Sequence, residues 1–123
     1  MKVTPIFFFV FASLSSYNGF SQNSKTSTTT KVGEKYAYVN VIKTYERVAE
    51  KGYKSIDLFE TLGNAFYADM NMEKAAKWYG ELFAITSDVK TIHYDQYAKS
   101  LYAIGEVEKA NGIIEKLNKK LNK

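Results

Sequence analysis

The residue types that most often carry out chemistry in proteins are scarce in this sequence of 123 residues. The chain has no cysteine and a single histidine, His93, two positions before Asp95. Because a zinc site needs three or four ligands, we predict no metal site and interpret His93 as a surface residue. No serine lies in a nucleophile-elbow sequence, and no glycine-rich phosphate loop is present. We therefore predict no catalytic residue and no cofactor, and expect a protein that is not an enzyme.

The charged residues are explained more simply as solvent-exposed than as reactive groups. Glu73 and Lys77 have the spacing of an ion pair on a helix. The formal net charge of +4 is only a weak indication of nucleic-acid binding. The chain ends in a basic segment, which a helix dipole explains, and the alternative is a contact with anionic glycan or lipid headgroups. Its lysines are Lys116, Lys119, Lys120 and Lys123.

The first 21 residues have the order of a secretory signal peptide. Lys2 supplies the positive start, Ile6–Leu14 form an apolar run, and Gly19 and Ser21 are the small residues that favour cleavage after Ser21. The alternative is an uncleaved amino-terminal anchor. The run is about half of the ~20 residues that a membrane-spanning helix needs, so we expect no membrane span after cleavage. The signal predicts export, which also argues against a nucleic-acid partner.

After the signal, residues 22–33 are rich in Ser, Thr and Lys and are predicted to be a flexible linker. Residues 34–123 show helical spacing of apolar residues almost throughout and no strand alternation, so the predicted fold class is all-α. Short connections between five expected helices make neighbouring helices antiparallel. The expected inward stripes are Tyr38, Val41, Tyr45 and Val48; Phe59, Leu62 and Phe66; Met72, Ala75, Tyr79 and Leu82; Tyr94, Tyr97, Leu101 and Ile104; and Val107, Ala110, Ile114, Leu117 and Leu121.

The helical segments repeat with a period of 34 to 35 residues. Met72-Glu73-Lys74-Ala75 returns as Val107-Glu108-Lys109-Ala110, and the aromatic and small positions of the two units correspond, although Ala98 and Ile114 depart from the pattern. The chain therefore resembles the tetratricopeptide (TPR) repeat family. The resemblance implies antiparallel helix pairs stacked as a short α-solenoid of about two and a half repeats. Gly63 and Ala75 would allow the helices of one pair to approach closely.

The run from Tyr45 to Phe83 also resembles the amino-terminal repeat region of OmpA-type envelope proteins of Gram-negative bacteria. This resemblance implies a periplasmic or outer-membrane-associated scaffold for protein–protein interaction. The alternative is a structural spacer, or a truncated fragment of a larger OmpA-family protein, with no ligand in its groove. No residue here matches a peptidoglycan-binding motif, so none is assigned that role.

The first helices of the two pairs would line a concave groove. Tyr67 and Tyr102 occupy the same repeat position and are the predicted aromatic anchors for a protein or peptide partner. The alternative is that both tyrosines pack on neighbouring helices and only complete the fold. The polar rim of this predicted groove consists of Glu60, Asn64, Asp95 and Lys99.

Two full repeats are fewer than the roughly three that stacks of this kind need for stability. The fifth helix has an apolar stripe, and we expect no sixth helix to cover it. We therefore also expect self-association, or a partner, at the carboxyl-terminal helix.

Overall fold

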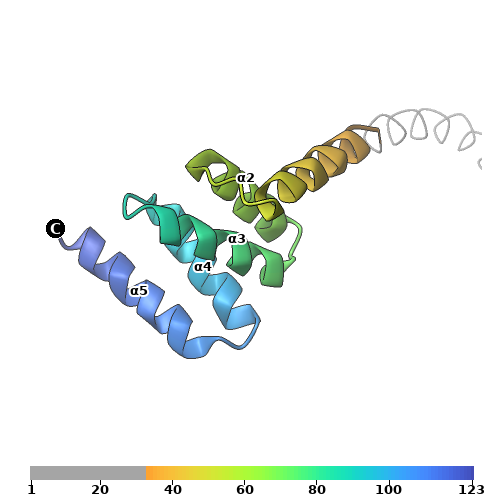
Figure 1. The fold of residues 1–123 in the computed structure, drawn as a ribbon. Coiled ribbons are helices and arrows are strands. Elements are labelled where there is room, and N and C mark those ends of the chain that lie inside the picture. The colour runs from red at the N-terminus through yellow and green to blue at the C-terminus, as the bar shows by residue number, and fades with distance from the viewer. Residues whose placement is uncertain (1–32) are drawn as a thin grey trace, which may run out of the picture. The chain divides into compact units, whose positions relative to one another are not determined.

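The computed structural model describes residues 33–123, and within this range all regular structure is helical. The first helix covers residues 33–50. It is followed by α2 (Ile56–Ala68), α3 (Met72–Ile85), α4 (Thr91–Ala103) and α5 (Val107–Leu121) (Figure 1). The predictions of an all-α fold and of five helices are confirmed for the described part of the chain. The predicted signal peptide and residues 22–32 of the predicted linker lie outside it.

The chain divides into two compact units between Asn40 and Val41. Of the first unit the structure describes residues 33–40, which are helical. The second unit contains the remainder of the first helix and α2 to α5. Its helices pack as two pairs, α2 with α3 and α4 with α5, and the pairs meet mainly through α3 and α4.

Local signals in the sequence set several helix boundaries. The Ser55 side chain accepts a hydrogen bond from the Leu58 N–H at the start of α2, and Asn71 does the same for the Lys74 N–H at the start of α3. Gly52 follows the first helix with φ of 103°, a conformation that glycine adopts without a steric penalty. Asn71 and Gly52 are residue types that these two positions favour, so both boundaries follow from the local sequence.

A close approach within the first pair lies where Tyr79 of α3 passes over Gly63 of α2. A Cβ atom at Gly63 would lie 2.5 Å from the Tyr79 Cε1 atom, so the ring occupies the volume of the missing side chain. Ala75 is completely buried nearby on α3. The expectation that these two small residues permit close packing of the helices is confirmed.

Aromatic side chains pack against one another in the interior of the second unit. The Phe59 and Trp78 rings stack with centroids 5.9 Å apart, and Phe83 meets the Tyr94 ring edge-on at 4.8 Å. Such pairs add to the free energy gained by burying apolar area. The largest completely buried apolar side chains are Phe59, Leu62, Tyr79 and Leu82.

The predicted inward stripe of the first helix is wrong. Tyr38, Val41, Tyr45 and Val48 are 39% to 53% exposed. The buried residues are instead Ile42 and Ala49. Two carboxylates of this helix explain the choice of face, because Glu46 and Glu50 lie toward α3 and pair with its lysines, Lys74 and Lys77. The more apolar stripe is left in solvent.

The predicted stripe of the fifth helix is correct only in part. Ala110 is buried, and Ile114 and Leu117 are partly buried against the core, but Val107 and Leu121 are 50% and 63% exposed. The sequence analysis missed Ile113, which is buried. The middle of the predicted face therefore packs, widened by Ile113, and its two ends are exposed.

Candidate functional site

The two helices predicted to line a groove, α2 and α4, lie in contact. We define the α2/α4 face as Glu60, Asn64 and Tyr67 of α2 together with Asp95, Lys99 and Tyr102 of α4. The polar members of this face are held by hydrogen bonds and ion pairs. They therefore present fixed rather than freely rotating groups to solvent.

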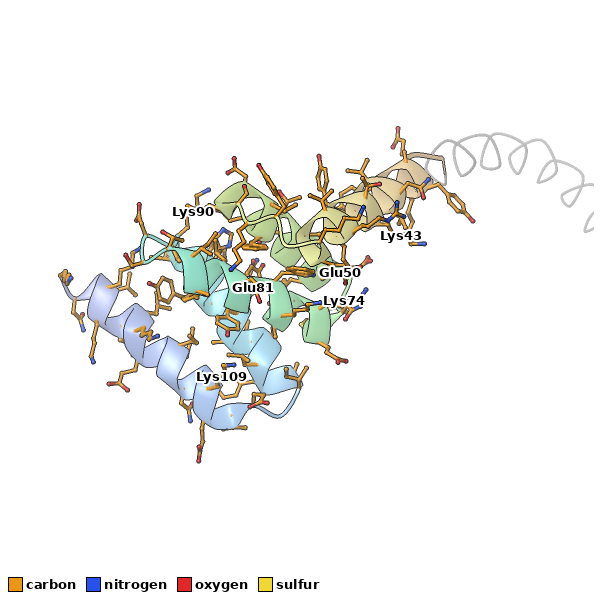
Figure 2. The ribbon with its side chains drawn as sticks, in the orientation of Figure 1. Lys43, Glu50, Lys74, Glu81, Lys90 and Lys109 are labelled. Carbon is orange, nitrogen blue, oxygen red and sulfur yellow. The ribbon has the colours of Figure 1, made fainter. Side chains whose placement is uncertain are left out.

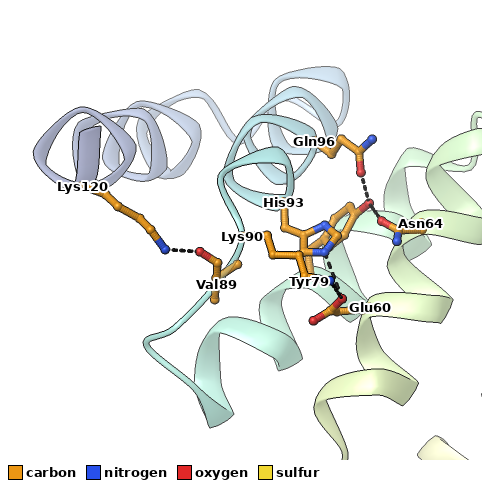
Figure 3. Close-up of polar contacts among 8 residues, drawn as sticks. All are labelled: Glu60, Asn64, Tyr79, Val89, Lys90, His93, Gln96 and Lys120. Atoms are coloured by element: carbon orange, nitrogen blue, oxygen red, sulfur yellow. Dashed lines mark hydrogen bonds and ion pairs between the residues drawn. The ribbon is translucent and has the colours of Figure 1, made fainter. Parts of the chain in front are cut away.

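Glu60 lies at the centre of one cluster of polar contacts on this face. Its Oε2 atom lies 3.2 Å from His93 Nε2 and 3.3 Å from Lys90 Nζ, so it joins α2 to α4 and to the residue that precedes α4 (Figure 3). The Glu60 side chain keeps 19% of its area exposed. It thus serves an internal contact and still reaches the surface.

The interpretation of His93 as a surface residue is wrong. The residue is only 3% exposed, and its ring lies 5.7 Å from the Tyr79 ring, measured between centroids. A carboxylate on another helix and an aromatic neighbour compensate for its burial. Its Nδ1 atom has no hydrogen-bond partner in the described part of the protein.

Asn64 belongs to a second cluster of contacts, centred on the Tyr79 hydroxyl. That oxygen lies 2.7 Å from Asn64 Oδ1 and 2.5 Å from Gln96 Oε1 (Figure 3). A hydroxyl donates one proton, so it donates to one amide oxygen, while the other amide, turned over, donates its N–H to the hydroxyl. Burial, and secondarily the neighbouring Tyr67, raises the pKa of Tyr79 well above its ordinary value of 10.0. The hydroxyl therefore stays protonated at neutral pH.

Asp95 and Lys99 form an ion pair one helical turn apart, with 2.9 Å between Oδ2 and Nζ. The hydrogen bond to Asp95, and then its charge, raises the pKa of Lys99. Both side chains are well exposed, at 40% and 61% of their areas. This pair is the part of the α2/α4 face that a partner would reach most easily.

The two predicted anchor tyrosines have different surroundings. Tyr67 is half-buried and packs against the core, which agrees with the packing alternative for this residue. Tyr102 is 43% exposed, and its hydroxyl donates a hydrogen bond to Asn111 of α5. Of the two, Tyr102 offers the larger accessible ring.

Three polar residues outside the predicted site organise this face: Lys90, Gln96 and His93, the last predicted to lie at the surface. His93 and Gln96 are three residues apart on α4, so they lie on the same side of the helix. That spacing is the signal that the sequence offers, but a lone histidine gives no indication of a buried carboxylate partner.

A second feature, a groove between α3 and α5 of about 780 Å³, was not predicted. Tyr97 and Leu101 of α4 line it, together with Ile104, which follows α4 and is 41% exposed. Its rim carries charges of both signs, among them Glu81 on α3 and Lys109 on α5 (Figure 2). Tyr97 and Leu101 are buried and already packed in the core, so the groove offers few free side chains to a ligand.

Three further observations bear on the function of the chain. Across residues 33–123, no three His, Cys or carboxylate side chains are grouped as a metal site. None of the helices in that same range is both long and apolar enough to cross a membrane. Protein-family models, curated proteins and solved structures give no match to the chain.

Proposed function

We propose that this chain is an exported TPR-like scaffold that binds a protein or peptide partner on the α2/α4 face. The observation that carries the proposal is the exposed Asp95–Lys99 pair, set beside the Glu60–His93 contact, which joins two helices from different pairs. Fixed groups of opposite charge favour a partner segment of mixed charge. Preorganised groups also lose little conformational entropy when they bind.

The repeat architecture is part of this proposal. Two helix pairs in sequence, a period of about 35 residues and the Gly63–Tyr79 approach support a short TPR-like solenoid. Membership of an OmpA-type envelope system, in the periplasm or at the outer membrane, rests on the resemblance of the segment from Tyr45 to Phe83 alone. Export rests on the signal-like sequence of residues 1–21 and predicts a mature protein that begins at Gln22. The intact mass of protein recovered from the envelope tests export, and a retained Met1 would contradict it.

The binding test exchanges the charges of the exposed pair. The double variant Asp95→Lys/Lys99→Asp keeps an ion pair of the same spacing but reverses the charges that a partner meets. Partners recovered from envelope fractions with the wild-type chain as bait, and identified by mass spectrometry, should be lost from the variant. Helix content and melting temperature should not change, because exposed pairs contribute less than about 1 kcal/mol.

A matched control exists on α5, where Glu115 and Lys119 form an exposed pair of the same spacing at 3.4 Å. The variant Glu115→Lys/Lys119→Glu should keep every partner. Equal recovery with both variants would contradict binding at the α2/α4 face and would favour the alternative, a structural spacer whose polar residues serve only internal contacts.

One observation favours a second candidate, self-association through α5. Val107 and Leu121 are 50% and 63% exposed at the two ends of this helix. A Val107→Ser/Leu121→Ser variant would stay monomeric at concentrations at which the wild type dimerises. A wild-type chain that sediments as a monomer at high concentration would exclude this candidate.

A further inference from the structure

One side of the first helix is an apolar stripe that stays partly exposed in the described part of the chain. Val41, Tyr45 and Val48 recur at helical spacing and are 39% to 45% exposed. Tyr53 and Ile56 follow in the chain and are 62% and 42% exposed. Isolated exposed apolar residues are ordinary, but a helical stripe followed by two more large apolar side chains marks an interaction surface.

The charges of the same segment are predominantly positive. Its two carboxylates are occupied, Glu46 by Lys74 at 3.0 Å and Glu50 by Lys77 at 3.7 Å. Four exposed cations remain without an ion pair among residues 33–123: Lys43, Arg47, Lys51 and Lys54. Figure 2 labels Lys43 on the first helix and Glu50 near α3. The segment therefore presents net positive charge to a partner.

The apolar and the basic residues of this segment lie on neighbouring sides, as in helices that bind at a membrane surface. At about 100° per residue, Lys51, which directly follows the helix, projects about 60° beyond Val48 on the side away from the buried Ile42 and Ala49, and Arg47 lies about 40° farther round on that side. Helices that lie in the plane of a membrane place valine and aromatic side chains at the acyl-chain boundary and keep lysine and arginine at the headgroups. Tyrosine is favoured at the same depth.

We propose that the side of the first helix formed by Val41, Tyr45 and Val48, with Arg47 and Lys51 at its edge, docks on an anionic phospholipid surface. The valines would enter the boundary of the acyl chains, and the cations would contact lipid phosphates. This surface includes no residue of the α2/α4 face, so the two proposals fail independently. The helix would lie on the membrane and not span it.

Two other occupants suit the surface less well. A second copy packed antiparallel through the stripe would bring the same edge of each helix together, so Arg47 and Lys51 would face their own counterparts and repel them. A nucleic acid or glycan would satisfy the cations, but it offers no apolar layer for two exposed valines. Dimerisation and binding of a nucleic acid or glycan are therefore measured alongside binding to vesicles.

The test uses the full chain and sedimentation with vesicles. The probes are vesicles of an equal mixture of phosphatidylglycerol and phosphatidylcholine, and vesicles of phosphatidylcholine alone. Arg47→Glu/Lys51→Glu should lower partitioning to the anionic vesicles roughly tenfold or more. Tyr45→Ser/Val48→Ser should also lower it, and binding of the wild type should weaken as salt is raised. All variants keep residues 1–32 unchanged, so these residues contribute equally to every measurement.

The control Lys109→Glu/Lys116→Glu makes the same change of charge on α5, at two exposed lysines without ion pairs in the described chain. It should leave partitioning within about twofold of the wild type. Hydroxyl-radical footprinting adds a local readout, in which anionic vesicles should slow oxidation of Tyr45 and leave Tyr102 unchanged. Each variant is checked for unchanged helix content by circular dichroism.

Three results would overturn the proposal. The first is equal partitioning of the wild type and Arg47→Glu/Lys51→Glu, and the second is unchanged oxidation of Tyr45 in the presence of vesicles. The third is binding to a nucleic acid or glycan, or dimerisation in solution, that accounts for protection of Tyr45 when no lipid is present.

Discussion

The two helix pairs differ in the residues at corresponding positions and in how their helices are capped. In α2/α3 the Tyr79 ring lies directly over Gly63, and Ser55 and Asn71 cap both helices with side-chain hydrogen bonds. In α4/α5 the corresponding positions are Ala98 and Ile114, and neither helix has a side-chain cap. The first pair is thus specified by its own sequence, whereas the second relies more on packing against α3.

The largest effect is expected from closing the space at Gly63. Gly63→Ala would place a methyl group 2.5 Å from the Tyr79 ring, which must shift within a filled core. We expect the free energy of unfolding to fall by about 1–3 kcal/mol, the range for overpacking. Urea denaturation of the wild type and the variant measures it. A variant as stable as the wild type would show that the approach of α2 and α3 is looser than described.

The buried Tyr79 should make the first pair sensitive to alkali. Because its pKa is raised in the folded protein, its contribution to stability is complete below the ordinary value of 10.0 and is lost as pH rises through the folded pKa. The wild type should lose stability above pH 10, in part through Tyr97, whose pKa burial also raises.

Tyr79→Phe tests this contribution. We expect it to be less stable by about 1 kcal/mol at neutral pH, because its hydrogen bonds are lost, but to lose less additional stability at alkaline pH. Urea midpoints at neutral and alkaline pH measure both effects. Equal additional losses of stability at alkaline pH in the wild type and the variant would mean that groups other than Tyr79 cause the sensitivity.

Substitutions at the helix starts should destabilise the first pair more than the second. Ser55→Ala removes an N-cap hydrogen bond and should cost about 1 kcal/mol, as in other proteins. Glu106→Ala is the matched change at the start of α5, where no side chain caps the helix, and it should change stability by less than about 0.5 kcal/mol. Thermal denaturation compares the two variants, and equal losses would remove this difference between the pairs.

The smallest effect, and one of opposite sign, is expected at Gly112 of α5. A Cβ atom there would meet nothing within 4 Å, whereas glycine inside a helix is less favourable than alanine. Gly112→Ala should therefore raise stability by up to about 1 kcal/mol. A loss of stability in the same urea titration would mean that α5 is packed more tightly than described.

The sequence predicted the parts of this fold that depend on local pattern. Helix positions, the Asn71 cap and the small residue at Gly63 all follow from spacing and residue type. The face of the first helix did not follow, because its apolar stripe is more hydrophobic than the side that packs, and the ion pairs of Glu46 and Glu50 involve residues 27 or more positions away. Such contacts leave no periodic signal.

The candidate site was predictable to a similar extent. The repeat positions placed Glu60, Asn64, Asp95 and Lys99 on two helices in contact, as the structure has them. Burial of His93 depends on Glu60, a residue on another helix, and a single histidine gives no indication of that pairing. The different surroundings of Tyr67 and Tyr102 arise from neighbours outside their own helices, which correspondence between repeats does not reveal.

Footprinting of the chain with its recovered partner tests the central claim, that the α2/α4 face binds. Tyr102 is 43% exposed on this face, and Tyr53 is 62% exposed away from it, so the two rings serve as probe and internal control in one sample. Hydroxyl-radical oxidation of Tyr102 should slow when the partner is added, while that of Tyr53 stays constant. Slower oxidation of Tyr53 with no change at Tyr102 would contradict binding at the α2/α4 face.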